Sequence, residues 1–359
     1  MRIIIGGDIA VKKNCEALFE NGETKALFND TIDILSQSFA TIVNLECTIT
    51  EKDTAIKKIG PNIKAPLNTA KVLKEAGVTH CALSNNHIFD YGKEGMKDTF
   101  AQLDKYGIGY TGFGENKEKA RENLVLTDGK ITVSVIAVCE HEYTYALENR
   151  MGAREYDPYD TNDDISEAKK NSDYVIVLYH GGKEECQYPS PRLLKACRSM
   201  IKHGADVVLC QHSHCIGCYE KYMHGHILYG QGNFHFICKE YENSNDAGYI
   251  WNTGFLTKID IENELNIEFI PCVAKNTAVS LAKGEEKDRI LSDFAKRNDI
   301  LNNGVWYEKW QEFARSQERY NIIPEELKEE IAHYFDCEAH MDVCKEIFKT
   351  YNHTNEIDN

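Results

Sequence analysis

Side chains able to bind metal ions occur just past the ends of five short apolar runs in this sequence. In chain order they are Asp8, then Glu46, then the group Asn85, Asn86 and His87, then His180, and finally the pair His212 and His214. Carboxylates, an amide oxygen and imidazoles together suit Mn²⁺, Fe²⁺ or Zn²⁺ better than a Ca²⁺ cage made only of oxygens. One or two such ions, with Glu46 shared, would generate hydroxide from water and clamp a tetrahedral or phosphoryl-like centre.

Each of these residues taken alone has an ordinary structural explanation. A single Asp or Glu after a strand is usually a helix cap or a turn former, and a buried His is often a hydrogen-bonded structural residue. The pair His212 and His214 is more specific, because alternate residues in a loop can both turn inward. The recurrence at five strand ends is what points to one joint site.

The apolar runs before these residues predict strands, and the stretches between them predict helices. Several of the helical stretches end at a glycine, which helix C-termini favour. Alternating strands and helices predict a largely parallel sheet, with functional residues in the loops past the carboxyl ends of the strands. The predicted strands are 3–6, 41–44, 79–83, 175–179 and 207–210, and the predicted helices are 67–76, 92–106 and 191–203.

Two further strand pairs and a helical tail complete the expected architecture. Runs 124–126 and 131–138 flank the turn pair Asp128-Gly129, and 255–261 precedes 265–269, which predicts antiparallel additions. After residue 282 the sequence becomes charged, aromatic and helical. We expect an α/β domain over residues 1–282 and a helical C-terminal appendage over 283–359, with helices near 289–296, 306–315, 324–334 and 339–351.

Charge, apolar runs and cysteines exclude several classes of protein. Lys and Arg total 41 against 57 Asp and Glu, so the net charge of −16 would repel nucleic acid on average. No run of 18 apolar residues and no signal-like segment is visible, which predicts no membrane insertion. The 13 cysteines are scattered and several lie in strand-like runs, so we expect buried free thiols in a reducing, cytoplasmic compartment. The oligomeric state stays open.

Several short motifs occur in a specific order along about residues 1–275. They are Gly7-Asp8, Asn44-Leu45-Glu46, the stretch Asn85-Asn86-His87-Ile88-Phe89-Asp90-Tyr91-Gly92, His180-Gly181-Gly182, His212-Ser213-His214 and Gly232-Asn233-Phe234. In this order they resemble the motifs of the CapA family, the capsule or poly-γ-glutamate biosynthesis proteins. The resemblance implies a metallophosphatase-like fold, which is a two-sheet sandwich flanked by helices.

The resemblance to calcineurin-like metallophosphatases also implies roles for individual residues. Asp8 and His214 would hold one metal, and Glu46 would bridge to a second. The second metal would be held by Asn86, His180 and His212.

The same resemblance implies residues beyond the metal ligands. His87 would be the acid or transition-state donor, and Asp90 would orient it through a hydrogen bond. Asn85, Glu185 and Asn233 are the candidates for substrate binding.

The sequence departs from the metallophosphatase pattern at three positions. Ala10 stands where a ligand His is usual, so the first metal would have fewer ligands and the second would bind more tightly. Gly181 replaces a usual Trp, and Ser213 replaces a usual Pro between the paired histidines. Family members commonly carry a membrane anchor, and none is visible here.

Two functions remain open on these grounds. The first is a metal-dependent hydrolase, phosphoesterase-like or amide-cleaving, that acts on a small molecule or an anionic polymer in capsule or poly-γ-glutamate metabolism. The second is a non-catalytic protein that binds a polymer or a partner on the same fold. Metal content and metal-dependent turnover discriminate between them.

Overall fold

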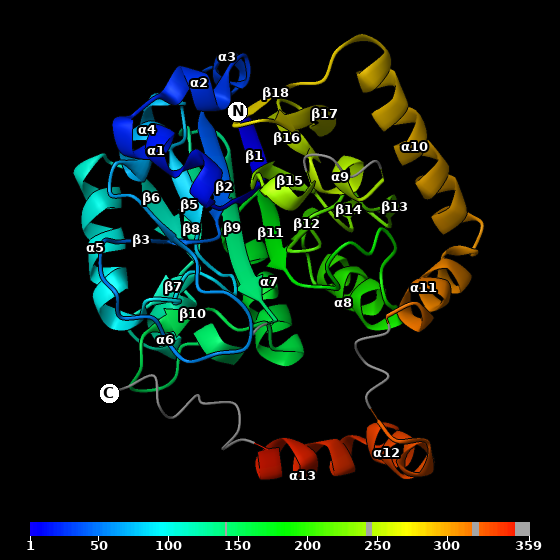
Figure 1. Cartoon of the computed structure of the whole chain (residues 1–359). Coiled ribbons are helices and arrows are strands. Elements are labelled where there is room, and N and C mark those ends of the chain that lie inside the picture. The colour runs from blue at the N-terminus through cyan, green and yellow to red at the C-terminus, as the bar shows by residue number, and fades with distance from the viewer. Residues whose placement is uncertain (141, 242–245, 318–322, 349–359) are drawn as a thin grey trace.

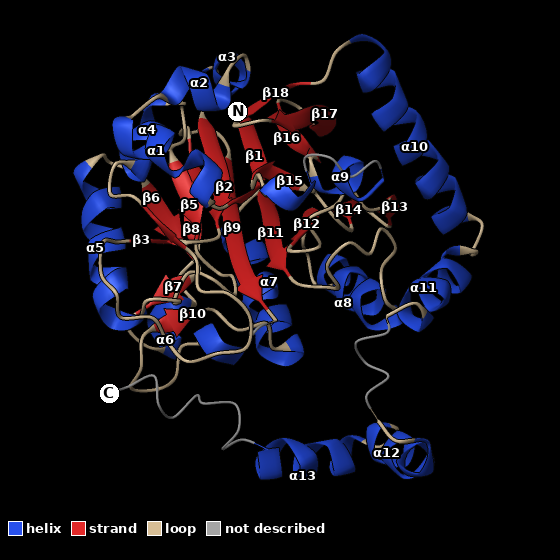
Figure 2. Ribbon diagram, viewed as in Figure 1, coloured by secondary structure: helices blue, strands red, loops and turns tan. Residues whose placement is uncertain are grey.

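The computed structural model describes residues 1–140, 142–241, 246–317 and 323–348. Within them, two main β-sheets pack face to face, and helices cover their outer faces (Figure 2). This arrangement confirms the predicted two-sheet α/β sandwich flanked by helices.

The first sheet has a parallel half and an antiparallel half that meet at β1. Its strand order is β18-β17-β16-β1-β2-β5-β6, and β15 pairs in parallel with the end of β1. The strands are β1 (Arg2–Ile9), β2 (Ala40–Leu45), β5 (His80–Ala82), β6 (Gly109–Thr111), β15 (Asn233–His235), β16 (Thr253–Ile261), β17 (Leu265–Lys275) and β18 (Ala278–Leu281). The antiparallel pairing of β16 with β17 confirms the predicted addition.

The second sheet is parallel in its middle and antiparallel at both edges. Its order is β13-β14-β12-β11-β9-β8. Asp128 forms the turn between β8 and β9, because its Oδ1 accepts the N–H groups of Lys130 and Ile131. The strands are β8 (Leu124–Thr127), β9 (Thr132–Cys139), β11 (Tyr174–His180), β12 (Val207–Gln211), β13 (Tyr219–Tyr222) and β14 (Gly225–Leu228); two small pairs are β3 (Thr48–Ile49) with β4 (Lys64–Ala65), and β7 (Phe113–Gly114) with β10 (Gly152–Ala153).

The central strands are buried on both faces, which explains their nearly continuous apolar sequences. Along β1, Ile3 and Ile5 point into the core between the sheets, while Ile4 points to the helices outside. Along β11, Leu178 faces the inter-sheet core and Val177 faces the other way. Each strand therefore joins two cores, since successive side chains alternate in direction.

Helices on the two outer faces complete four layers. Buried residues of α1 to α5 join the core outside the first sheet, and those of α7 and α8 join the core outside the second. Ser190 caps α8 by accepting the N–H of Leu193, with Pro191 in the first turn. These helices are α1 (Lys13–Asn21), α2 (Thr24–Phe28), α3 (Thr31–Ser36), α4 (Thr69–Glu75), α5 (Gly92–Lys105), α7 (Pro158–Asn171) and α8 (Pro191–Lys202); shorter ones are α6 (Lys117–Ala120), α9 (Asp246–Trp251), η1 (Glu142–Thr144) and η2 (Lys239–Tyr241).

The C-terminal segment is helical, as predicted, but its first helix shares the main core. Ile290 and Phe294 of α10 are buried, and the Phe294 ring lies 4.9 Å from the ring of Phe255. The expected boundary after residue 282 thus separates α10 from its own packing partners, and we propose that α10 belongs to the sandwich (Figure 1). The helices are α10 (Gly284–Asn302), α11 (Trp306–Arg315), η4 (Glu325–Leu327), α12 (Lys328–Phe335) and α13 (Glu338–Phe348).

The described residues test the expectations about the last helix and about membrane insertion only in part. The predicted helix 339–351 matches α13, but positions 349–351 lie outside the described residues. Among the residues that are described, no helix combines the length and the apolar character needed to cross a membrane.

Candidate metal centre

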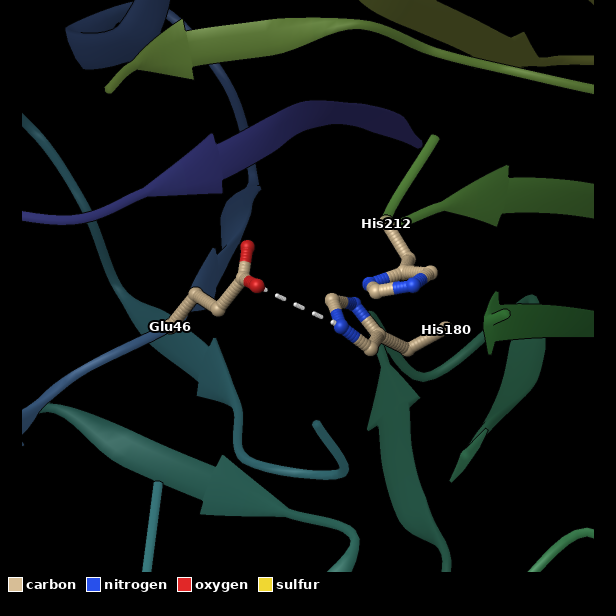
Figure 3. Close-up of side chains that lie close together, drawn as sticks. All are labelled: Glu46, His180 and His212. Carbon is tan, nitrogen blue, oxygen red and sulfur yellow. Dashed lines mark ion pairs between the residues drawn. The ribbon is translucent and has the colours of Figure 1, made fainter. Parts of the chain in front are cut away.

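The carboxyl ends of β1 and β2 in one sheet meet those of β11 and β12 in the other. One potential ligand atom from each of Glu46, His180 and His212 lies within 4.8 Å of the others, and the same holds for Asp8, Glu46 and His214. Figure 3 shows the Glu46 carboxylate facing the two imidazoles across the junction of the sheets. Glu46 belongs to both groups, which is the place that the family resemblance implies for it.

Glu46 is held by its backbone but not by its side chain. Its N–H donates to the carbonyl of Ile9 at 2.8 Å, which fixes the residue directly after β2. Both carboxylate oxygens are buried with no hydrogen-bond partner among the described residues. Oε1 lies 3.5 Å from Nε2 of His180 and 3.9 Å from Nε2 of His214. Burial and the nearby Asp8 charge raise the pKa of Glu46 well above its usual value.

Asp8 is surrounded by hydrogen-bond donors. Its Oδ1 accepts Nδ2 of Asn44 at 2.8 Å, and its Oδ2 accepts the backbone N–H of His212 at 3.0 Å. Nδ1 of His214 lies 3.3 Å from Oδ2. Burial alone would raise the pKa of Asp8, but the His214 hydrogen bond and the charges of His180 and His214 outweigh it and lower that pKa.

His214 is held between carboxylates and an aromatic wall. Its Nδ1 lies 2.9 Å from Oδ1 of Asn233, and its ring centroid is 4.6 Å from that of Trp251. Burial disfavours the imidazolium, but the charges of Glu46 and Asp8 prevail and raise the pKa of His214 to about 9.

Asn233 lies behind His214, where the sequence had suggested a contact with substrate. It is 3% exposed, and its Nδ2 donates to the carbonyl of Trp251 at 3.0 Å. The segment that carries Gly232 and Asn233 can lie this close to β1 only because Gly7 has no side chain. A Cβ at Gly7 would lie 1.9 Å from the carbonyl oxygen of Gly232. Asn233 therefore orients His214.

The other half of the centre is less charged. Nε2 of His180 lies 2.9 Å from Oδ1 of Asn86, and Nδ1 lies 3.1 Å from Nδ2 of Asn44. The His180 and His212 ring centroids are 4.9 Å apart. Burial lowers the pKa of His180 to about 4, so its imidazole is neutral near pH 7.

The loop that carries the paired histidines has an uncommon backbone. His212 has φ of 78° and His214 has φ of 51°, which is the left-handed region that costs a residue with a side chain about 1–3 kcal/mol. The N–H of Glu185 donates to the carbonyl of Ser213 at 2.7 Å and ties the loop down. The Glu185 side chain is exposed and accepts the Tyr241 hydroxyl at 2.7 Å, which places it on the surface.

His87 and Asp90 form the pair that the sequence suggested. Nδ1 of His87 lies 2.7 Å from Oδ2 of Asp90, and the His87 side chain is 10% exposed. Burial lowers the pKa of His87 despite the Asp90 charge. A third member, Lys58, was not predicted: its ammonium forms an ion pair with Asp90 and lies 3.2 Å from Nδ1 of His87.

Asn85 is fully buried, and its amide is engaged on both sides. Its Oδ1 accepts the N–H groups of His87 and Ile88, and its Nδ2 donates to Oδ1 of Asn44 and to the carbonyl of Leu45. Asn85 therefore fixes the turn and orients Asn44, while its contact with substrate stays a prediction.

The structure shows what surrounds Ala10 and Gly181, two of the positions that depart from the metallophosphatase pattern. Ala10 is 1% exposed, and its N–H donates to the His235 carbonyl, so the position supplies no ligand. At Gly181 a Cβ would lie 2.5 Å from the Glu140 carboxyl carbon, so Glu140 occupies the space next to the glycine. Glu140 accepts the Gly182 N–H at 2.8 Å and pairs with Arg192 at 2.6 Å, which holds the end of β11.

Three supporting residues escaped sequence reasoning. Asn44 lies inside the motif Asn44-Leu45-Glu46, but its position within β2 hides its contacts with Asp8 and His180 from the sequence. Glu140 directly follows β9, as Glu46 follows β2, so the strand-end rule would have found it. Lys58 lies in an irregular stretch, and no local pattern marks it.

Comparison with known proteins assigns the chain to a family. The family "Bacterial capsule synthesis protein PGA_cap" matches residues 2–237. The chain is 29% identical over 239 residues to the capsule biosynthesis protein CapA of Bacillus anthracis, covering 64% of this chain and 58% of that one. It is also 29% identical over 236 residues to the PGA biosynthesis protein CapA of Bacillus subtilis strain 168, covering 64% and 62% respectively.

These matches cover about three fifths of the relatives' own length. Among solved structures, a hypothetical protein from Thermus thermophilus overlaps 79% of this chain and all of its own, with 15% identity and a TM-score of 0.49. The family match spans most of both sheets and reaches every strand end that carries a candidate ligand, and so the chain belongs to the bacterial capsule synthesis protein family PGA_cap.

Proposed function

We propose that this chain is a metal-dependent hydrolase of the capsule synthesis family. The observation that carries this proposal is the fully buried carboxylate of Glu46. In the part of the chain that the structure describes it has no hydrogen-bond partner, and it lies among side chains that can ligate a metal. A bare buried carboxylate is costly unless it is paired or coordinates a cation. The mixed nitrogen and oxygen donors suit Mn²⁺, Fe²⁺ or Zn²⁺.

The ligands divide into two sets that share Glu46. Asp8 and His214 belong to one, and the other consists of Asn86, His180 and His212. When bound, divalent ions supply Lewis-acid polarisation and a nucleophile derived from water at neutral pH. Asn44 contacts Asp8 and His180, one from each set, and so fixes their relative positions.

His87 would transfer or hold a proton at Nε2. Asp90 fixes the ring through Nδ1, and the partial exposure of His87 leaves an edge accessible. General acid or charge-stabilising help of this kind is worth about 10² to 10⁴ in rate. Glu185, on the surface, remains the candidate for contact with substrate.

The relatives' names refer to capsule and PGA biosynthesis. We therefore propose that the substrate is a small molecule or an anionic polymer of that metabolism, with a phosphoester or amide bond as the bond cleaved. The same centre would serve either bond, because both reactions pass through a centre that gains negative charge on oxygen.

The test measures metal content and turnover on the same preparations. Protein dialysed against Mn²⁺ or Zn²⁺ would be analysed for bound metal and assayed with bis(p-nitrophenyl) phosphate and with γ-linked oligoglutamate. We expect bound metal and metal-dependent hydrolysis in the wild type, loss of both in Glu46→Gln, and metal retention in His87→Ala with turnover reduced about 10² to 10⁴ fold.

His224→Ala, at an exposed histidine, is the matched control and should behave like the wild type. Wild-type protein that holds no metal would refute the proposal. Metal binding without turnover of either substrate would favour a binding protein on this fold, and an active, metal-replete His87→Ala variant would remove His87 from the mechanism.

A further inference from the structure

The side chain of Lys58 is buried, although much of the loop that carries it is exposed. The loop joins β3 to β4 without regular structure, and the next residue, Ile59, is 86% exposed. The Lys58 side chain is only 3% exposed. Lysine is rarely buried unless its charge is paired, so this side chain needs a specific partner.

The partners of Lys58 belong to the turn that carries Asn86 and His87. Its ammonium donates to the Asn86 carbonyl at 3.0 Å and forms an ion pair with Oδ1 of Asp90. Lys58 therefore contacts the main chain of a candidate metal ligand and the partner of the candidate acid.

The donor and acceptor capacities of Lys58, Asp90 and His87 fix the direction of the hydrogen bonds among them. An ammonium only donates, and a carboxylate only accepts. Nδ1 of His87 lies 2.7 Å from Oδ2 of Asp90 and 3.2 Å from the Lys58 ammonium, so its proton points to Asp90 and Lys58 directs its own protons to Asn86 and Asp90. These contacts involve Nδ1, so Nε2 is the ring nitrogen of His87 that could hold or transfer a proton.

Asp90 also binds the rest of the loop to the same turn. Its carboxylate accepts the Ile63 N–H at 2.7 Å, and its carbonyl accepts the Ile56 N–H at 2.9 Å and Nδ2 of Asn62 at 3.0 Å. Loop and turn thus share one hydrogen-bonded centre, and Lys58 supplies its only cation among the partners described here.

We propose that Lys58 is a positioning residue of the metal centre, which holds the Asn86 carbonyl and the Asp90 carboxylate so that the Asn86 amide and the His87 ring keep their places. This inference rests on the proposed function, because the expected effect on metal binding requires Asn86 to be a metal ligand. It does not require Lys58 to touch substrate, and the burial of its side chain fits that restriction.

The experiment compares Lys58→Met with Lys52→Met, which removes an exposed lysine of the same loop. Hydrogen exchange of the metal-free proteins would be followed by mass spectrometry, and Mn²⁺ or Zn²⁺ affinity by calorimetry. We expect Lys58→Met to lose protection in peptides covering 54–63 and 85–91 while β1 and β11 stay protected, and to bind metal about 10 to 100 fold more weakly. Lys52→Met should match the wild type in both measurements.

Lys58→Arg keeps the charge and two or more donors, so it should recover part of the affinity and of the local protection. If Lys58→Met does not fold, the Lys58→Arg variant provides the test instead. Wild-type affinity and wild-type exchange of 85–91 in Lys58→Met, or equal weakening in Lys52→Met, would overturn the inference. Loss of protection spread over both sheets would assign Lys58 to global stability instead. If the wild type binds no metal, the proposed function fails, while the exchange measurement still decides whether Lys58 holds the turn.

Discussion

The two halves of the candidate metal centre share Glu46 but differ in what their side chains already do. Oδ2 of Asp8 and Nδ1 of His214 lie 3.3 Å apart, and each group favours the charged form of the other. His180 has Oδ1 of Asn86 at 2.9 Å, and burial keeps its ring neutral, with a pKa of about 4. One half is therefore a formed ion pair, and the other is an uncharged pair.

Both histidines are buried within 3.9 Å of Asp8 and Glu46, so the carboxylates alone do not explain the difference. Hydrogen bonds to Asp8 and Asn233 raise the pKa of His214, and the charge of His214 adds to burial in lowering the pKa of His180. A histidine must be deprotonated to ligate a metal, so the charge on His214, whose pKa is about 9, opposes binding near neutral pH. His180 has no such proton to lose. Together with Ala10, which removes one ligand from the Asp8 side, the comparison predicts that the half with His180 fills first and more tightly.

The largest expected effect comes from removing one histidine of each half. His180→Ala should abolish the tighter of two binding steps in a Mn²⁺ or Zn²⁺ titration, with a loss of more than about 100 fold, which exceeds the usual effect of removing an outer supporting residue. His214→Ala should remove only the weaker step. Calorimetry on both variants measures the two steps separately.

The same titration could also give results that contradict this prediction. If His214→Ala removes the tighter step and His180→Ala leaves it, the order of the halves is the opposite of our prediction. A single step lost equally in both variants would mean that only one ion is bound, with ligands drawn from both halves.

A smaller effect should follow from removing the support of His214. Asn233→Ala deletes the acceptor that lies 2.9 Å from Nδ1 of His214, so Nδ1 loses one of its two oxygen partners and keeps Asp8. We expect the weaker metal step to lose about 10 to 100 fold in affinity and the tighter step to stay unchanged. An equal loss in both steps would show that the halves are not independent.

The smallest expected effect concerns Glu140, which supports the His180 side. Burial favours the acid form of Glu140, but Arg192, Tyr179 and the Gly182 N–H lower its pKa below the usual value of 4.5. A lowered folded-state pKa contributes stability above pH 4.5, and that contribution is lost as the pH falls through the folded-state value.

Glu140→Gln should therefore lower the free energy of unfolding by about 1–2 kcal/mol near pH 7, a modest figure because the Arg192 side chain is 63% exposed. Urea unfolding at several pH values should show the gap between the two proteins closing below about pH 4.5. A gap independent of pH would assign the loss to packing, and a weakened tighter metal step would show that this support reaches His180.

Much of the fold could be predicted because its strands are apolar runs with clear ends. The helix predicted at 306–315 coincides with α11, and the hairpin around Asp128-Gly129 pairs as expected. α7 was missed, although Asp157 and Pro158 give it a regular N-terminus, because its face is mostly polar. Short strands such as β15 leave too few residues for a periodic pattern to be read.

The candidate site was predictable to the extent that it follows the strand-end rule. That rule places Asp8, Glu46 and His180 correctly at one junction, and the family motifs supply their order. The supporting contacts are different, since they depend on which side chains meet across the sheets. Asn44 and Lys58 act through partners far away in the sequence, which no spacing within a single motif reveals.

The hydrogen bond from the His212 N–H to Asp8 joins the two sheets across a separation of 204 residues. A chain emerging from the ribosome therefore presents Asp8 and Glu46 long before their partners exist, and no earlier segment completes the centre. Contacts of such long range close late, because the loop entropy must be overcome first. An ion that binds only the closed sandwich, at 100 times its dissociation constant, would add about 2.7 kcal/mol to stability. Metal supply during synthesis would then set how much of the chain stays folded.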